Sequence, residues 1–146
     1  MTDLDTLLPF WVETLARPGL SWRARFQTWR CHPQDERFSH LESAVTAARA
    51  AAIGDGGKAM APDHQLPVIV CLSHSEDLED HELALDLLAN WEAITGNREP
   101  ELAALLQERH EVVRQFGRFP ARNRLLRRPS SPTEAYFMLG AGQQYL

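Results

Sequence analysis

The order of helix starts and stops constrains the fold of this 146-residue chain more than any other feature of its sequence. Three long stretches carry apolar residues at helical spacing, and each is followed by a glycine that can end a helix. These glycines are Gly54, Gly96 and Gly117. Ser39 stands three residues before Glu42, and Ser73 three before Glu76, which is the spacing of a capping box at a helix start. The pattern predicts helices over 39–54, 73–96 and 97–117.

The remaining segments also favour helices. Ser131, followed by Pro132 and Glu134, predicts the start of a last helix. In the N-terminal third, Pro18 and Gly19 divide two helical stretches, 3–16 and 21–31. The apolar run 66–72 fits a short strand, a buried helix or an extended loop, but a lone strand would have no partner. We therefore expect an all-α fold of about six to seven antiparallel helices packed side by side.

The composition is that of a globular protein, with 44% hydrophobic and 24% charged residues. A chain of this length forms one core, so we expect a single domain over 1–146. The net charge of −5 argues against a general nucleic-acid binder. The N-terminus is acidic where a secretory signal would be basic, and every apolar run is too short to span a membrane. We therefore expect a cytoplasmic protein without a cofactor.

Two cysteines raise the question of a metal site. Cys31 adjoins His32, and Cys71 stands three residues before His74. The two pairs differ in spacing, unlike the regular pairs of structural zinc sites. We interpret both cysteines as reduced thiols and expect no metal.

Charge is distributed unevenly near the C-terminal end of the sequence. Residues 109–128 contain seven Arg and one acid, Glu111, whereas residues 76–86 contain six acids and no base. The two segments could face each other or form solvated helix faces. Alternatively, some of the Arg line a pocket for a phosphate or carboxylate, which a guanidinium binds with two parallel hydrogen bonds. A nucleic-acid interface is the weakest interpretation, because basic residues are sparse elsewhere.

Two polar residues fall on apolar helix faces. Arg109 lies near the middle of the apolar face of 97–117, so it must be paired or line a polar cavity. His81 shares a face with Leu78, Leu85 and Leu88, where a histidine is more often a satisfied core residue than a catalyst. Glu76 is explained by its place in the capping box, but His74 has no such explanation. The chain lacks the common hydrolase, metalloprotease and nucleotide-binding motifs.

The segment 116–123, with sequence FGRFPARN, forms a corner after the long helix. Gly117 can end that helix, Pro120 can restart one, and Phe116 and Phe119 can fill the turn. A corner does not require Arg118, Arg122 and Asn123. These three side chains either bond the open carbonyls of a helix end or contact a ligand.

The stretches HSEDLEDHE (74–82) and FGRFPARNRLLRRPSSPTEAYFM (116–138) together resemble the bacterial domain-of-unknown-function family nine-twenty-four. The resemblance covers about 37–138 and implies a tetratricopeptide-like stack of helices, with no reaction assigned. It implies that His74, Ser75, Glu76, Arg118, Arg122 and Asn123 are the polar positions of the family motifs. The family usually has His in place of Ala121 and Gln in place of His81. An upstream Pro-Arg-Asn segment of the family is not reproduced, which implies a diverged or N-terminally shortened member.

Three functions remain open. We rank first a binding module for a peptide or small anionic ligand, with His74, Glu76, His81, Arg109, Arg118, Arg122 and Asn123 as candidate contacts. An alternative is a hydrolase-like enzyme with His74 or Glu76 as general base and Arg stabilising negative charge. A further alternative is a structural or partner-binding protein without a small-molecule site. No nucleophile is identifiable, and the ligand and oligomeric state do not follow from the sequence.

Overall fold

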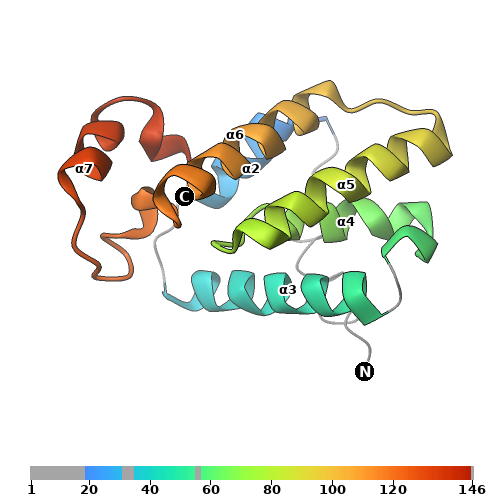
Figure 1. The fold of residues 1–146 in the computed structure, drawn as a ribbon, viewed down its shortest axis with the longest axis horizontal. Coiled ribbons are helices and arrows are strands. Elements are labelled where there is room, and N and C mark those ends of the chain that lie inside the picture. Colours follow the sequence, from blue (N-terminus) through green and yellow to red (C-terminus); the bar gives the residue numbers. More distant parts are fainter. Residues whose placement is uncertain (1–18, 31–34, 55–56, 146) are drawn as a thin grey trace.

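The computed structural model describes residues 19–30, 35–54 and 57–145, and these residues form helices and loops without a strand (Figure 1). The α-helices of this part are α2 (Trp22–Arg30), α3 (Asp35–Gly54), α4 (Pro62–Leu72), α5 (Leu78–Thr95), α6 (Pro100–Phe116) and α7 (Pro132–Leu139). Short 3-10 turns occur at η2 (Gly57–Ala59), η3 (Pro120–Arg122) and η4 (Ala141–Gln144). The all-α prediction is confirmed. The helix expected over 3–16 lies outside the described residues.

Helices that follow one another in the chain pack together. Helix α3 contacts α4, α4 contacts α5, α5 contacts α6, and α2 packs on α6. The links 73–77 and 96–99 are short, which makes the helices they join antiparallel neighbours. Figure 1 shows α5 and α6 side by side, with α7 and its loops at the far end of the molecule. Whether this order forms a tetratricopeptide-like stack stays a prediction.

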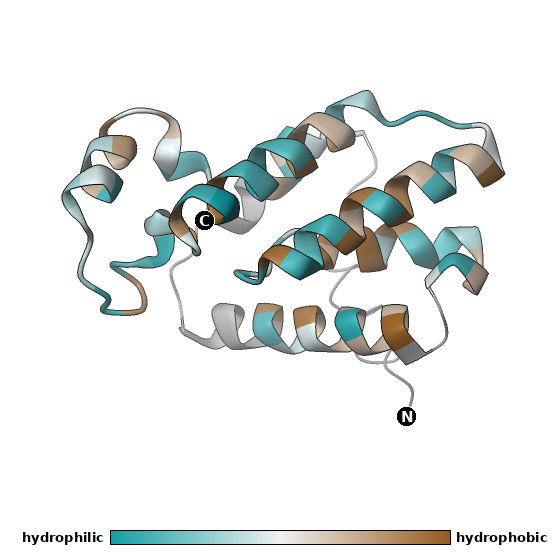
Figure 2. Ribbon diagram, in the orientation of Figure 1, coloured by the Kyte–Doolittle hydropathy of each residue, from teal (hydrophilic) through white to brown (hydrophobic). Residues whose placement is uncertain are grey.

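Small residues bring α3 close to its neighbour. Ala44, Ala48 and Ala51 are each at most 1% exposed and lie in the main apolar cluster. Because alanine side chains are short, the two backbones can approach closely and still fill the space between them. Figure 2 shows hydrophobic positions recurring along α3, α4 and α5, as expected for helices with neighbours on more than one side. These three residues form the alanine stripe of α3.

Both predicted capping boxes before the long helices are wrong. Helix α3 begins at Asp35, before Ser39, because the intervening residues contain nothing that stops a helix and acids favour a first turn. Ser73 caps the C-terminal end of α4, and its hydroxyl donates back to the carbonyl of Val70 at 2.6 Å. The N-cap of α5 is Asp77, whose side chain accepts from Glu79 N at 3.0 Å. Glu76 therefore lies in a loop and is not part of a cap.

The other local predictions can be compared directly. The run 66–72 belongs to helix α4, which contains Pro67 and buries Val68 to Leu72 completely. The segment before this run contains η2 and the first turn of α4. Gly96 and Gly117 end α5 and α6 with φ values of 73° and 72°. Ser131 and Glu134 form both bonds of a capping box.

The interior consists of two apolar clusters. The larger one is formed by α2 to α6, and the smaller one contains Val112, Val113, Phe119 and Tyr145. Their junction lies where α6 turns into the 116–123 corner. Within the described residues, no helix combines the length and the apolar character needed to cross a membrane.

Candidate functional site

The aromatic ring of Phe119 is the centre of the 116–123 corner. Phe119 is fully buried in the smaller cluster, and Phe116 is half-buried beside it. Two guanidinium groups lie over the Phe119 ring, that of Arg109 at 4.5 Å and that of Arg122 at 4.6 Å from its centroid. Cations are attracted to the negative face of an aromatic ring, and more strongly where water is excluded. The corner therefore holds two buried cations around one ring.

Arg109 joins the two apolar clusters. It extends from α6, is 2% exposed, and also lies 5.3 Å from the ring centroid of Phe26, which belongs to the larger cluster. Its Nε donates to the carbonyl of Ser73 at 2.8 Å. Burial lowers the pKa of Arg109 to about 9, so the group stays charged at neutral pH. The sequence predicted that this arginine is paired or lines a polar cavity, and in the structure its Nε is paired with a backbone carbonyl.

Arg122 is held at the same end of α4. Its Nη2 donates to the carbonyl of His74 at 2.7 Å, and burial lowers its pKa to about 10. The carbonyls of Ser73 and His74 lie just past the last residue of α4, Leu72. Carbonyls at a helix C-terminus lack helical donors and carry a partial negative charge. This local field is the physical reason that two guanidiniums can be buried here.

Both predicted histidines are buried and neutral near pH 7. Nδ1 of His74 is 2.8 Å from the carbonyl of Val70, and Nε2 of His81 is 2.6 Å from the carbonyl of Ser75. A carbonyl only accepts, so each of these nitrogens carries the proton. Burial, with the charge of Arg109, holds the pKa of His74 well below its ordinary value. Burial likewise lowers the pKa of His81 to about 4.

Arg118 and Asn123 face the loop that leads to α7. Arg118 donates to both carboxylate oxygens of Glu134 at 2.8 Å and to the carbonyl of Pro129 at 2.8 Å. The Arg118 hydrogen bond, more than any other contact, lowers the pKa of Glu134 to about 2. Asn123 donates to Ser130 Oγ at 3.0 Å. Both side chains therefore hold the corner through the 129–134 segment, and not through the open carbonyls of a helix end that the sequence interpretation proposed.

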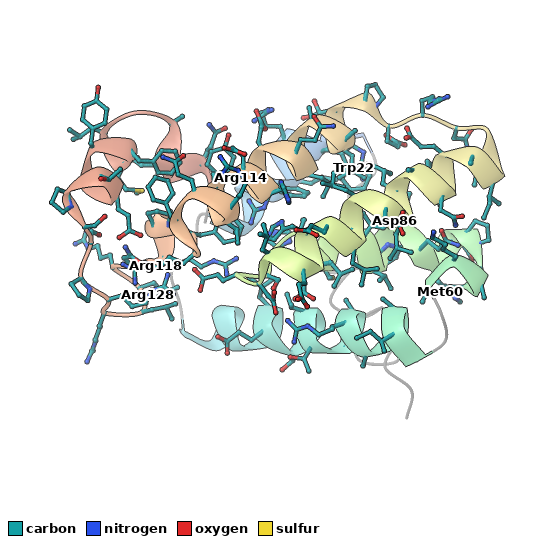
Figure 3. All side chains as sticks on the ribbon, viewed as in Figure 1. Trp22, Met60, Asp86, Arg114, Arg118 and Arg128 are labelled. Atoms are coloured by element: carbon teal, nitrogen blue, oxygen red, sulfur yellow. The ribbon has the colours of Figure 1, made fainter. Side chains whose placement is uncertain are left out.

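Glu76 and Arg128 connect this loop to the start of α5. Arg128 binds the two carboxylate oxygens of Glu76 at 2.8 and 2.9 Å and donates from Nε to Asn123 Oδ1 at 3.0 Å. Glu76 Oε2 also accepts from Phe119 N at 2.7 Å. Burial alone would raise the pKa of Glu76, but these bonds and the nearby charge of Arg122 hold it below its ordinary value. Figure 3 labels Arg118 and Arg128, both at the end of the molecule that carries α7.

The acidic and basic segments therefore meet, but only in part. Glu76 pairs with Arg128, as the facing interpretation requires. Asp80 instead binds Arg49 of α3 through two guanidinium nitrogens and accepts from Ser75 Oγ at 2.6 Å. Burial would raise the pKa of Asp80, but the bonds from Arg49 and Ser75 lower it.

A pocket of about 290 Å³ opens between α3 and the loop that follows α4. The described residues that line it are Leu41, Glu42, Val45, Thr46, Arg49, His74, Ser75, Glu76 and Arg122. Three of the seven candidate residues thus lie in its wall: His74, Glu76 and Arg122. The other four candidates are not among the described residues that line this pocket: His81, Arg109, Arg118 and Asn123.

Sequence reasoning missed the α3 side of this pocket. Glu42 was interpreted as part of a capping box, and Thr46 and Arg49 were not singled out. Helical spacing does place the exposed Glu42 and Thr46 on one face, four residues apart. Nothing in the sequence indicated that this face lies against the 74–76 loop. Arg128 was counted among the seven Arg, but its pairing with Glu76 was not foreseen.

The structure describes one of the two Cys–His pairs that were considered as a metal site. Cys31 and His32 lie outside the described residues. Cys71 is fully buried, and burial raises the pKa of its thiol to about 12. Among the residues that the structure describes, no three His, Cys, Asp or Glu side chains are grouped so that they could hold a metal ion.

Comparison with known proteins gives one match. The model of the family described as "Bacterial protein of unknown function (DUF924)" matches residues 25–142, a wider range than the motifs alone indicated. No curated protein and no solved structure matches the chain.

Proposed function

We propose that this chain, which belongs to the DUF924 family of bacterial proteins of unknown function, is a binding module for a small ligand or peptide group that carries a negative charge. One observation carries the proposal. Arg122 is 3% exposed, yet its side chain forms part of the wall of the 290 Å³ pocket. A cation that is shielded from water but reaches a pocket is suited to hold an anion.

The physical argument rests on the surroundings of Arg122. Hydrogen bonds from a charged donor are stronger than neutral ones, and a low local dielectric strengthens them further. A planar guanidinium also matches the geometry of a carboxylate or phosphate. Ser75 and the neutral His74 add polar groups to the wall, and Leu41 and Val45 add apolar contact. A few converging polar groups on an apolar wall are typical of ligand pockets, and the volume is near the lower end of their range.

A hydrolase-like enzyme is the second candidate, and the geometry of His74 favours it. With its Nδ1 proton bonded to Val70 O, the unprotonated nitrogen of His74 is Nε2, as a general base requires. The low pKa of His74 makes it a weak base, however. Glu76 is a poorer candidate, because Arg128 and Phe119 N occupy both of its oxygens. We therefore rank the binding module above the enzyme, and keep a purely structural role as the third possibility.

Two broader features belong to the same proposal. The consecutive packing of α3, α4, α5 and α6 supports a tetratricopeptide-like stack of helix pairs, a class of scaffold that presents concave binding surfaces. A cytoplasmic location and a single domain remain our expectations for the chain.

The proposal is tested by titrating hexanoate and, separately, inorganic phosphate into the ¹⁵N-labelled protein and following amide shifts. We expect millimolar or tighter binding, with the largest shifts at Thr46, Ser75 and Glu76. Thr46→Trp should block it, because Thr46 is exposed on α3 and lines the pocket. Ala50→Trp, at an exposed position of the same helix outside the described lining, is the matched control. If neither anion shifts these amides, or if both tryptophan variants behave alike, anion binding in this pocket is refuted.

A further inference from the structure

The pocket wall contains an acid whose role is not explained by the fold. Glu42 lies on α3, is exposed, and lines the pocket. Within the described part of the chain, Glu42 makes no side-chain hydrogen bond and no ion pair. Glu42 thus differs in its bonding from Glu76, whose carboxylate binds Arg128 and Phe119 N.

Glu42 and Arg122 act on each other across the pocket. The negative charge of Glu42 favours the charged form of Arg122 and so opposes the effect of burial on the Arg122 pKa. The two residues come from separate elements, α3 and η3, and both belong to the lining. The pocket therefore presents an anion-binding group and a cation-binding group on different walls.

Arg49 and Glu76, which also line the pocket, each form an ion pair within the protein. Arg49 binds Asp80 through two nitrogens, and Asp80 is itself held by Ser75. These contacts hold Arg49 and the 74–76 loop in place beside the pocket. Leu41 and Val45 add apolar contact to the lining.

We propose that the ligand is a zwitterion of the size of a free amino acid, with its carboxylate at Arg122, its ammonium group at Glu42 and an apolar side chain against Leu41 and Val45. The inference rests on the proposed function and names the ligand class of the same pocket. A ligand with both charges contacts both Arg122 and Glu42, whereas a simple anion still pairs with Arg122 but binds more weakly because Glu42 is nearby. The modest volume of 290 Å³ suits an amino acid better than a folded peptide.

Three matched probes test the assignment by calorimetry or amide shifts. Norleucine carries both charges, hexanoate lacks the ammonium group, and hexylamine lacks the carboxylate. We expect norleucine to bind at least about tenfold more tightly than either of the others, a typical effect of one satisfied charged contact. Glu42→Gln should bring the ratio of norleucine to hexanoate affinity close to one. Glu82→Gln is the control, because Glu82 is an exposed acid of α5 that is not among the described residues that line the pocket. This variant should leave the ratio of norleucine to hexanoate affinity unchanged.

The outcomes separate a failure of the zwitterion proposal from a failure of the proposed anion-binding function. Hexanoate binding as tightly as norleucine, in a manner that Thr46→Trp blocks, overturns the zwitterion and leaves the anion-binding function in place. Preference for hexylamine overturns the zwitterion and makes Glu42 the dominant group. If none of the three probes binds, or if Thr46→Trp does not weaken binding, the ligand class and the proposed pocket both fail.

Discussion

Replacing His81 by glutamine should make the stability of the protein less dependent on pH. His81 is 1% exposed, its Nε2 bonds to Ser75 O, and its ring meets Phe119 edge-on at a centroid distance of 5.7 Å. Burial favours the neutral imidazole, and the charges of Arg109 and His110 act in the same direction, while Asp80 opposes them. A glutamine amide can still donate to Ser75 O, but it does not titrate.

The size of the effect follows from the pKa of His81, which falls from 6.5 to about 4 on folding. Below pH 6.5 the unfolded chain binds a proton that the folded protein does not, so stability is lost as the pH falls. The full shift corresponds to about 3 kcal/mol. Between pH 7.5 and 5.5, linkage gives a loss of about 1.3 kcal/mol from His81. The carboxylates with lowered pKa contribute mainly below pH 5, so they do not mask this change.

The measurement is the free energy of unfolding in urea at several pH values between 5.5 and 7.5. We expect His81→Gln to cost about 1 kcal/mol at pH 7.5 and to converge with the wild type toward pH 5.5. His74 adds a pH dependence of the same sign, but both proteins share it, so it cancels in the difference. His64→Gln, which removes a partly exposed imidazole of α4, controls for the loss of a histidine. If the free energy of unfolding changed equally with pH in the wild type and in His81→Gln, a buried, neutral His81 would be refuted.

Three further substitutions test the corner and its neighbours, each by urea unfolding. Phe119→Ala should cost about 3–5 kcal/mol because the ring is fully buried, and the half-buried Phe116→Ala should cost clearly less; equal losses would contradict the central position of Phe119. Gly117→Ala should cost about 1 kcal/mol from its φ of 72°, since an added Cβ meets nothing within 4 Å, and an unchanged stability would contradict this helix end. Ser131→Ala removes the capping box and should cost about 1 kcal/mol, so a neutral result would mean that α7 does not depend on its cap.

Sequence alone predicted the features that depend on neighbouring residues. The predictions for Gly96, Gly117 and Ser131 were correct, because a positive φ or a cap involves only a few residues around it. Arg109 was placed in the interior from the periodicity of a single helix. Ser73 was misassigned because its hydroxyl can serve the helix before it or the helix after it, and the end of α4 could not be located in an apolar run.

Only one side of the pocket could be predicted from the sequence, and the reason differs from the one that led to the misassignment of Ser73. His74, Glu76 and Arg122 stand out as polar residues in otherwise structural segments. Glu42 lies on an ordinary exposed helix face, and its proposed role depends on the loop that faces it across the pocket lining. Contacts between α3 and the 74–76 loop are set by how the alanine stripe of α3 packs on α4. That distance and angle depend on the whole core, so no local pattern encodes them.

The corner at 116–123 shows why bracing and ligand contact need not exclude each other. Arg118 and Asn123 are bonded within the loop, so the corner keeps its shape through them. That shape places Phe119 against α6 and sets Arg122 beside the ring, with one nitrogen on the carbonyl of His74. A lysine at position 122 could bond the carbonyl but could not present a planar group to the ring and to a carboxylate together. An arginine at position 122 therefore fits both the turn and the proposed carboxylate site, and a loss of stability on its removal would not argue against a role in binding.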